Sequence, residues 1–141
     1  MGERLEVVGA GQGKRAVEDK NGREVGELAD CIFCKIAAGE LKSDIVHQDE
    51  EVVAFRDINP QAPVHIVLIP RAHHASLNDT GPEDDQTLGY LVRLAAKIAR
   101  DEGLWEQGYR IVVNCGAAAG QSVDHLHFHL LGGRDFRWPP G

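Results

Sequence analysis

The clearest pattern in the chain is Ser122-Val123-Asp124-His125-Leu126-His127-Phe128-His129-Leu130-Leu131, close to the C-terminus. A β-strand sends alternate side chains to opposite faces. The alternation predicts a strand over Val123–Leu131, with the three histidines on an exposed face and Leu126, Phe128 and Leu130 on the buried one. The apolar face fixes this register, because a slip of one residue would put three imidazoles in the core.

Three explanations of the histidines compete. They serve as polar filler on a half-exposed strand, or they bind a metal, since neutral imidazole is a common zinc ligand. The third explanation is nucleophilic catalysis. Imidazole attacks phosphorus well when one ring nitrogen is free and the other donates its proton to a fixed acceptor. Three imidazoles in a row offer no packing gain, which disfavours the first explanation. We favour the third.

The loop that precedes the histidines supports phosphate chemistry. It reads Asn114-Cys115-Gly116-Ala117-Ala118-Ala119-Gly120-Gln121-Ser122 and has almost no side-chain bulk. Backbone N–H groups of such a loop can approach a phosphate closely. A Gly-rich loop alone is weak evidence, but one that leads into three aligned histidines predicts a site where amide dipoles and imidazoles, rather than net charge, hold an anion.

The composition indicates one compact soluble domain: 141 residues, of which 43% are hydrophobic and 26% charged. No apolar stretch approaches the ~20 residues of a membrane span, so no membrane partner is expected. The chain has 22 acidic and 15 basic residues and a net charge of −7, which disfavours binding to nucleic acid. Its three cysteines do not suit a disulfide scaffold and favour a reducing compartment, the cytoplasm or also the nucleus.

Residues 1–29 differ from the rest, because they are rich in glycine and charge and have only scattered apolar residues. We expect an N-terminal extension that is either mobile or a weak hairpin with its turn at Asn21-Gly22. Residues 30–141 then form the folded domain.

Capping and spacing predict two helices in that domain. Asp30 is the expected N-cap of a short helix over residues 31–36 that stops at Gly39. A long helix is expected after Thr80-Gly81-Pro82, with acidic residues in its first turn and Gly103 at its end. The positions of this helix that repeat at helical spacing, and should be buried, are Leu88, Leu91, Leu94 or Ala95, and Ile98.

Apolar and β-branched runs between turn residues predict the strands. They are Ile45–His47, Glu51–Asp57, Val64–Ile69, Tyr109–Cys115 and Val123–Leu131. Connections before and after the long helix are short. This order favours an α+β fold with an antiparallel sheet.

Cys31-Ile32-Phe33-Cys34 places two thiols about one helical turn apart. Such a pair is ambiguous between a redox motif, a zinc site and two buried thiols. A redox pair usually sits in a βαβ context, which is missing here. Zinc takes four nitrogen or sulfur ligands, and the candidates for the other two are His73, His74 and His125.

Taken together, these residues resemble the histidine triad (HIT) superfamily. His125–Leu131 fits its signature His-φ-His-φ-His-φ-φ, where φ is hydrophobic. Segments similar to the Hint branch, the histidine triad nucleotide-binding proteins, are Asp57–His65, Tyr109–Asn114, Gly120–Val123 and the ending Leu131-Gly132-Gly133-Arg134 with Trp138-Pro139-Pro140-Gly141. The resemblance covers residues 30–141. It implies a HIT-like α+β fold with a five-stranded antiparallel sheet, one long and one short helix, and pairing into a homodimer.

The resemblance also implies an activity, hydrolysis of purine nucleoside phosphoramidates such as AMP-NH2 or AMP–lysine, or their GMP counterparts. His127 would attack the α-phosphorus and form a nucleotidyl-histidine intermediate that water then cleaves. The backbone carbonyl of His125 would fix the tautomer of His127, while His129 and the Gly120–Ser122 amides would hold the phosphate oxygens. This chemistry needs no cofactor. The implied catalytic residues are His65, Ser122, His125, His127 and His129.

A substrate site and a metal site are implied as well. Asp57 would accept hydrogen bonds from the ribose, apolar side chains would wall the base, and Trp138 would reach the partner's site in the dimer. Arg56 stands where many Hint members have histidine, so the choice between adenine and guanine stays open. The substrate-binding set is Phe33, Ile36, Phe55, Arg56, Asp57, Ile58, Asn114, Gly120, Gln121, Ser122, His127, His129 and Trp138. The ligands of a structural zinc would be Cys31, Cys34, His73 and His125.

Other activities fit parts of this pattern. A dinucleoside polyphosphate hydrolase of the Fhit branch is one, although the C-terminal Trp-Pro-Pro-Gly looks like Hint. A nucleotidyltransferase is disfavoured by His129, because transferase branches usually have glutamine there. From a different class, a nucleotide-binding scaffold or sensor with incidental turnover would use the same pocket. A metal-binding regulator would rest on Cys31 and Cys34 alone.

Overall fold

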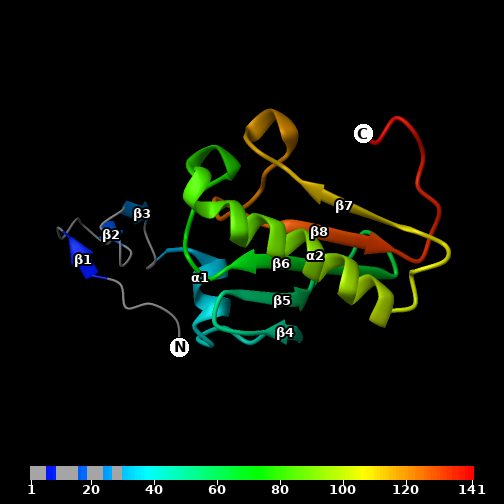
Figure 1. Cartoon of the computed structure of the whole chain (residues 1–141), viewed down its shortest axis with the longest axis horizontal. Coiled ribbons are helices and arrows are strands. Elements are labelled where there is room, and N and C mark those ends of the chain that lie inside the picture. The colour runs from blue at the N-terminus through cyan, green and yellow to red at the C-terminus, as the bar shows by residue number, and fades with distance from the viewer. Residues whose placement is uncertain (1–5, 9–15, 19–23, 27–29) are drawn as a thin grey trace.

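A computed structural model describes residues 6–8, 16–18, 24–26 and 30–141 of the chain. Its main body is a five-stranded antiparallel sheet with a long helix on one face and a short helix on the other (Figure 1). The strands are β4 (Ile45–Gln48), β5 (Val52–Arg56), β6 (Val64–Pro70), β7 (Tyr109–Val113) and β8 (Phe128–Gly132). They lie in the order β4-β5-β6-β8-β7. The predicted α+β class with an antiparallel five-stranded sheet is confirmed.

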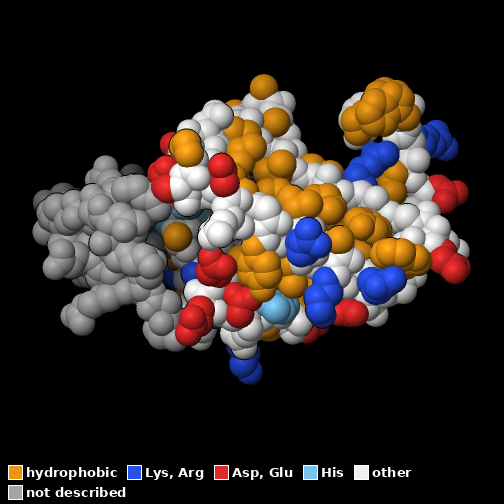
Figure 2. All heavy atoms as spheres, in the orientation of Figure 1, with side chains coloured by type: hydrophobic (Ala, Val, Ile, Leu, Met, Phe, Trp, Pro, Cys, Tyr) orange, Lys and Arg blue, Asp and Glu red, His pale blue; other side chains and the backbone are white. Residues whose placement is uncertain are grey.

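The long helix α2 (Asp85–Asp101) covers one face through the stripe that its spacing predicts. Leu91, Leu94, Ala95 and Ile98 are buried against β5, β6 and β8, and Leu88 is partly buried. A 3₁₀ turn over Pro82–Asp84 precedes the helix, so the predicted proline start belongs to that turn. Figure 2 views this face, where acidic and basic side chains are interspersed with hydrophobic ones.

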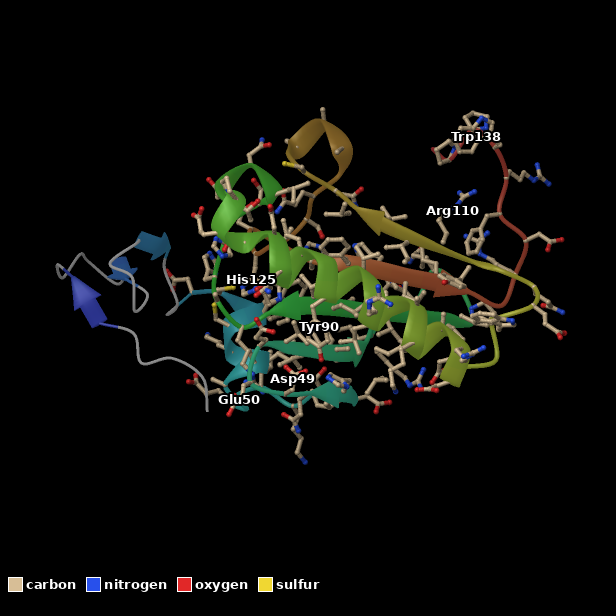
Figure 3. All side chains as sticks on the ribbon, viewed as in Figure 1. Asp49, Glu50, Tyr90, Arg110, His125 and Trp138 are labelled. Carbon is tan, nitrogen blue, oxygen red and sulfur yellow. The ribbon has the colours of Figure 1, made fainter. Side chains whose placement is uncertain are left out.

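The start of α2 is tied to the edge of the sheet by a hydrogen-bonded turn. Tyr90 donates its hydroxyl hydrogen to Oδ2 of Asp49, which lies in the turn between β4 and β5 (Figure 3). The other carboxylate oxygen of Asp49 accepts the N–H groups of Glu51 at 2.8 Å and Val52 at 2.9 Å. One carboxylate therefore shapes the turn and anchors the helix.

The short helix α1 (Ile32–Ala37) packs on the opposite face of the sheet. The prediction that Asp30 caps it is wrong, because Cys31 has the extended backbone of an N-cap and its Sγ accepts the Cys34 N–H at 3.3 Å. Gly39 ends the helix as expected, with a φ of +79° that favours glycine. The thiol that caps α1 also belongs to the cluster described below.

The histidine-bearing strand is shorter than predicted. β8 begins only at Phe128, which pairs with Leu68 of β6 and with Val113, the last residue of β7. Before that point the Leu126 N–H donates to the His74 carbonyl, outside the sheet, at 2.7 Å. The apolar alternation survives, since Leu126, Phe128 and Leu130 are all buried towards α2.

The predicted exposure of the histidines is wrong for two of the three. His125 is 0% exposed and His127 3%, while His129 is half-buried. The reason is α1, which covers the second face of the sheet with a smaller core that includes Phe55 of β5 and Val67 of β6. The histidines therefore lie at the edge of a packed layer rather than on an open surface.

A separate three-stranded antiparallel sheet is formed by β1 (Glu6–Val8), β2 (Ala16–Glu18) and β3 (Glu24–Gly26). The predicted turn at Asn21-Gly22 lies outside the described residues. A mobile or hairpin-like extension over 1–29 stays a prediction. Among the residues that the structure describes, no helix has the length and apolar character needed to cross a membrane.

Candidate active site and metal cluster

His127 is held with one ring nitrogen free. Its Nδ1 lies 2.7 Å from the carbonyl oxygen of His125. Because a carbonyl can only accept, Nδ1 carries the proton, and the neutral ring keeps a lone pair on Nε2. Burial lowers the pKa of His127 below its usual value, so the ring is neutral at pH 7. The arrangement suits a nucleophile.

His129 lies next to His127 but has the opposite tautomer. The Gln61 N–H donates to Nδ1 of His65 at 3.0 Å, so neutral His65 carries its proton on Nε2. That Nε2 lies 2.9 Å from Nδ1 of His129, which therefore accepts and keeps its own proton on Nε2. The two triad rings, with centroids 4.9 Å apart, thus present one lone pair and one N–H donor.

Burial is also the main cause of a low pKa for His129, and the neighbouring His127 and His65 add to it, so that its pKa is about 4. At pH 7 the ring is neutral. A neutral N–H donor attracts no anion in the free protein. It can therefore stabilise the negative charge that develops on a phosphate oxygen during the reaction.

This low pKa gives a prediction for stability. In the unfolded state the His129 ring binds a proton at about pH 6.5, whereas in the folded state it does so only near pH 4. The free energy of unfolding should therefore fall as the pH drops from 6.5 to 4. We expect urea unfolding to show a weaker pH dependence between pH 6.5 and 4 for His129→Gln than for the unmodified chain. Equal slopes for the two proteins would contradict the prediction.

Asp57 follows β5 and lies beside the histidines. Its Oδ2 is 3.4 Å from Nε2 of His65, and its Oδ1 accepts the Asn59 N–H at 2.8 Å. Asp57, His65 and His129 are close enough to resemble a metal site. However, the Gln61 N–H occupies the lone pair of His65 Nδ1 and leaves a proton on Nε2, so the neutral ring has no lone pair to offer there.

The Gly/Ala loop has the backbone that its composition predicts, but some of its N–H groups donate to carbonyls of the same loop. Gly116 and Gly120 have φ values of 91° and 87°, and a 3₁₀ turn over Ala117–Ala119 lies between them. The Gly120 N–H donates to the Ala117 carbonyl at 3.0 Å. The Gly120 amide therefore serves the loop itself, and the cradle of Gly120–Ser122 amides stays a prediction.

The residue after Gly120 serves the loop as well. The Gln121 N–H donates to the Gly116 carbonyl at 3.2 Å, and its side-chain oxygen accepts the Gly116 N–H at 2.9 Å. Its amide nitrogen donates to the carbonyls of Ala75 at 2.7 Å and Val123 at 3.0 Å. Gln121 thus shapes the loop instead of pointing to a ligand. Ser122 is exposed and Asn114 is half-buried.

The apolar residues predicted to wall the base divide into two groups. Phe33, Ile36 and Phe55 are buried, and the Phe33 ring meets Phe55 edge-on at 5.5 Å and His127 at 5.0 Å. Ile58, in contrast, is 96% exposed. Trp138 is 84% exposed and lies near the C-terminus, away from His125 (Figure 3).

Arg56 lies on the face of the sheet opposite to Phe55. Adjacent strand residues face opposite sides, and because Phe55 faces α1, Arg56 faces α2. There both guanidinium Nη atoms donate to the Glu102 carboxylate, at 3.2 and 2.9 Å. The contact of Arg56 with the nucleotide stays a prediction, and its pairing with Glu102 speaks against that contact.

Arg56→Ala should therefore leave the KM for a nucleotide substrate unchanged. The free energy of unfolding should fall by roughly 0.2–1 kcal/mol, because the ion pair is partly exposed. Steady-state kinetics and urea unfolding measure the two quantities, and Glu102→Ala is the matched control. If KM rises for Arg56→Ala and not for Glu102→Ala, Arg56 contacts the nucleotide after all.

A second group of side chains, here called the Cys/His cluster, consists of Cys31, Cys34, His73 and His125. All four are buried, and their ligand atoms lie within 4.8 Å of one another. Nδ1 of His125 is 3.3 Å from Sγ of Cys31, and Nδ1 of His73 is 3.2 Å from Sγ of Cys34. His74 is not part of the cluster, since its Nε2 lies near Asp84 at 3.7 Å.

The donor chemistry of the cluster fits zinc. Nε2 of His125 donates to the Pro70 carbonyl at 2.8 Å, so the lone pair of His125 lies on Nδ1 and points into the cluster. A metal-binding imidazole commonly gives its other N–H to a carbonyl in this way. Hydrogen bonding from the Cys34 thiol is the main cause that holds the pKa of the Cys31 thiol well below its usual range. Two sulfurs and two imidazoles are a common tetrahedral zinc set.

Comparison with known proteins shows which family and which relatives the chain is similar to. A HIT domain family model matches residues 38–136. Purine nucleoside phosphoramidase of Escherichia coli K12 is 52% identical over 103 residues, 73% of this chain and 87% of that protein. A 14 kDa zinc-binding protein of Zea mays is 50% identical over 112 residues, 78% of this chain and 87% of that protein. A HIT family hydrolase of Legionella pneumophila has a TM-score of 0.78 at 49% identity, covering 79% of this chain and all of that one.

Proposed function

The chain belongs to the HIT domain family, and on that premise we propose that it hydrolyses the P–N bond of purine nucleoside phosphoramidates. The observation that carries the proposal is the pair of tautomers, a free lone pair on Nε2 of His127 beside an N–H on Nε2 of His129. A nucleophile and an oxyanion donor on adjacent rings are what attack at phosphorus requires.

In the first step, Nε2 of His127 attacks the α-phosphorus. The new P–N bond to the ring forms while the bond to the leaving amine breaks, and the departing nitrogen takes the bond electrons and one proton from solvent through the Ser122 hydroxyl. Nδ1–H of His127 stays on the His125 carbonyl, which stabilises the positive charge of the substituted ring. His129 donates Nε2–H to a non-bridging oxygen.

In the second step, water attacks the nucleotidyl-His127 intermediate. A new P–O bond forms while the bond between phosphorus and Nε2 breaks and the ring takes back its electron pair. The attacking water gives up one proton to solvent, and the nucleoside monophosphate leaves. His65 takes no part in bond making. It orients His129 through the 2.9 Å hydrogen bond between their rings.

Phe33, Ile36 and Phe55 form the proposed apolar wall for the base. The Asp57 carboxylate accepts hydrogen bonds from the ribose hydroxyls. The preference between adenine and guanine rests on residues other than Arg56, which is paired with Glu102 on the other face.

The Cys/His cluster is the proposed site of a structural zinc ion. Bound there, the metal supplies a cross-link between the start of α1, the segment after β6 that carries His73, and His125. The positions of the four ligands, all buried and converging, support this proposal.

The protein is proposed to act as a homodimer in the cytoplasm. β7 is an edge strand whose residues Tyr109–Val113 are half-buried, so pairing with a second copy would cover both its backbone and its apolar side chains. Trp138 at the exposed C-terminus would then reach the partner's site. Sedimentation equilibrium tests the dimer, and a monomer at micromolar concentration would contradict it.

The activity is tested by assaying an adenosine phosphoramidate, such as AMP-morpholidate, beside a diadenosine polyphosphate. We expect the higher kcat/KM for the phosphoramidate, because the proposed leaving group is an amine. A higher value for the dinucleotide would favour the polyphosphate hydrolase, and tight AMP binding without turnover of either would favour the scaffold or sensor.

A further inference from the structure

One residue belongs to both sites of the molecule. The imidazole of His125 is part of the Cys/His cluster, with its Nδ1 at 3.3 and 3.5 Å from the two cysteine sulfurs. The backbone carbonyl of the same residue accepts Nδ1–H of His127 at 2.7 Å. Because His125 is fully buried, its ring and its carbonyl cannot turn independently of the packing around them.

A second contact joins the two sites through Phe33. This residue lies between the two cysteines of the cluster, and its side chain is buried. Its ring meets His125 edge-on with centroids 5.9 Å apart, and His127 with centroids 5.0 Å apart. Phe33 thus fills the space between the Cys/His cluster and the proposed nucleophile.

The helix that carries Phe33 is too short to be stable by itself. α1 has six residues, and helices of that length need tertiary contacts. Its N-cap is the Cys31 thiol, and its buried side chains include Cys34 of the same cluster. The geometry of the two cysteines therefore decides where Phe33 lies.

We propose that the Cys/His cluster, when it holds zinc, positions the nucleophile, with Phe33 and the His125 peptide as the positioning residues that fix the His127 ring. Only the Nδ1–H tautomer of His127 leaves Nε2 free to attack. If the His125 carbonyl moves away, the proton of His127 can move to Nε2. The lone pair then lies on Nδ1, and Nε2 can no longer attack phosphorus. The consequence for turnover rests on the proposed function, but the tautomer is a property of the free protein.

The first arm of the test compares the zinc-loaded full chain with the chain stripped by a chelator. Nitrogen-15 NMR of the histidine side chains at a single pH of 7.5 reads the tautomer of His127. We expect one zinc per chain and only the Nδ1–H form in the loaded protein, and a mixture of both forms after stripping. With a phosphoramidate, formation of the nucleotidyl-enzyme should slow by roughly 10- to 100-fold, as for other changes around metal ligands.

The second arm of the test keeps the zinc ligands and changes the contact between Phe33 and the two histidines. Phe33→Leu retains an apolar side chain and all four ligands, so zinc content should stay at one per chain while the His127 tautomers become mixed. Ile32→Ala is the matched control in the same motif, because the Ile32 side chain is 46% exposed. It should show only the Nδ1–H form.

The outcomes separate the two proposals. Failure to take up zinc, or an unchanged His127 tautomer both in the folded, stripped chain and in Phe33→Leu, would overturn the positioning role. If stripping unfolds the chain, the Phe33→Leu result decides alone. If no form of the protein turns over a phosphoramidate but the tautomer shifts as expected, the proposed function fails and the positioning role stands.

Discussion

Replacing His127 with alanine should lower kcat/KM for a nucleoside phosphoramidate by at least roughly 10⁴-fold, the scale of losing a nucleophile in other covalent enzymes. The reason is that the neighbouring ring cannot replace the lone pair on Nε2 of His127, because Nε2 of His129 carries a proton. Binding of AMP, measured by calorimetry, should be largely kept, because the base and ribose contacts come from other residues.

His47→Ala is the control for the loss of an imidazole outside the site, since His47 pairs with Asp49 at 2.8 Å near the edge of the sheet. It should keep normal turnover. Mass spectrometry of the unmodified protein after acid quenching should find one nucleotide attached at residue 127. Near-normal activity of His127→Ala, or a nucleotide attached elsewhere, would reject the assignment.

Local periodicity was enough to predict the apolar side of the triad and the buried stripe of α2. Leu126, Phe128 and Leu130 alternate, and such alternation depends only on strand geometry. The burial of His125 and His127 depends instead on α1, which packs on the second face from a distant part of the sequence. A signal for that second layer existed, because residues 64–69 are apolar almost without alternation, as in strands buried on both faces.

The face of the sheet on which Arg56 lies could have been predicted by the same geometry. Phe55 and Arg56 are neighbours on β5, so both cannot face the base. The family resemblance led to a contact that strand alternation disfavours. In contrast, the Gln61 N–H that sets the tautomer of His65, and the use of the Gly120 N–H inside its own loop, have no signature in side-chain types. Backbone hydrogen bonds of loops become visible only in a structure.

His129→Ala should lower kcat by roughly 10²- to 10³-fold, the usual cost of one oxyanion donor, and so by less than the loss of His127. His129→Gln should recover part of this loss, because its side-chain amide can place an N–H near the position of Nε2. The same glutamine at position 127 should recover nothing, since an amide nitrogen has no lone pair for phosphorus. Steady-state and pre-steady-state kinetics of the four variants decide between a donor and a nucleophile at each position. Equal rescue by glutamine at both positions would show that neither ring acts as the nucleophile.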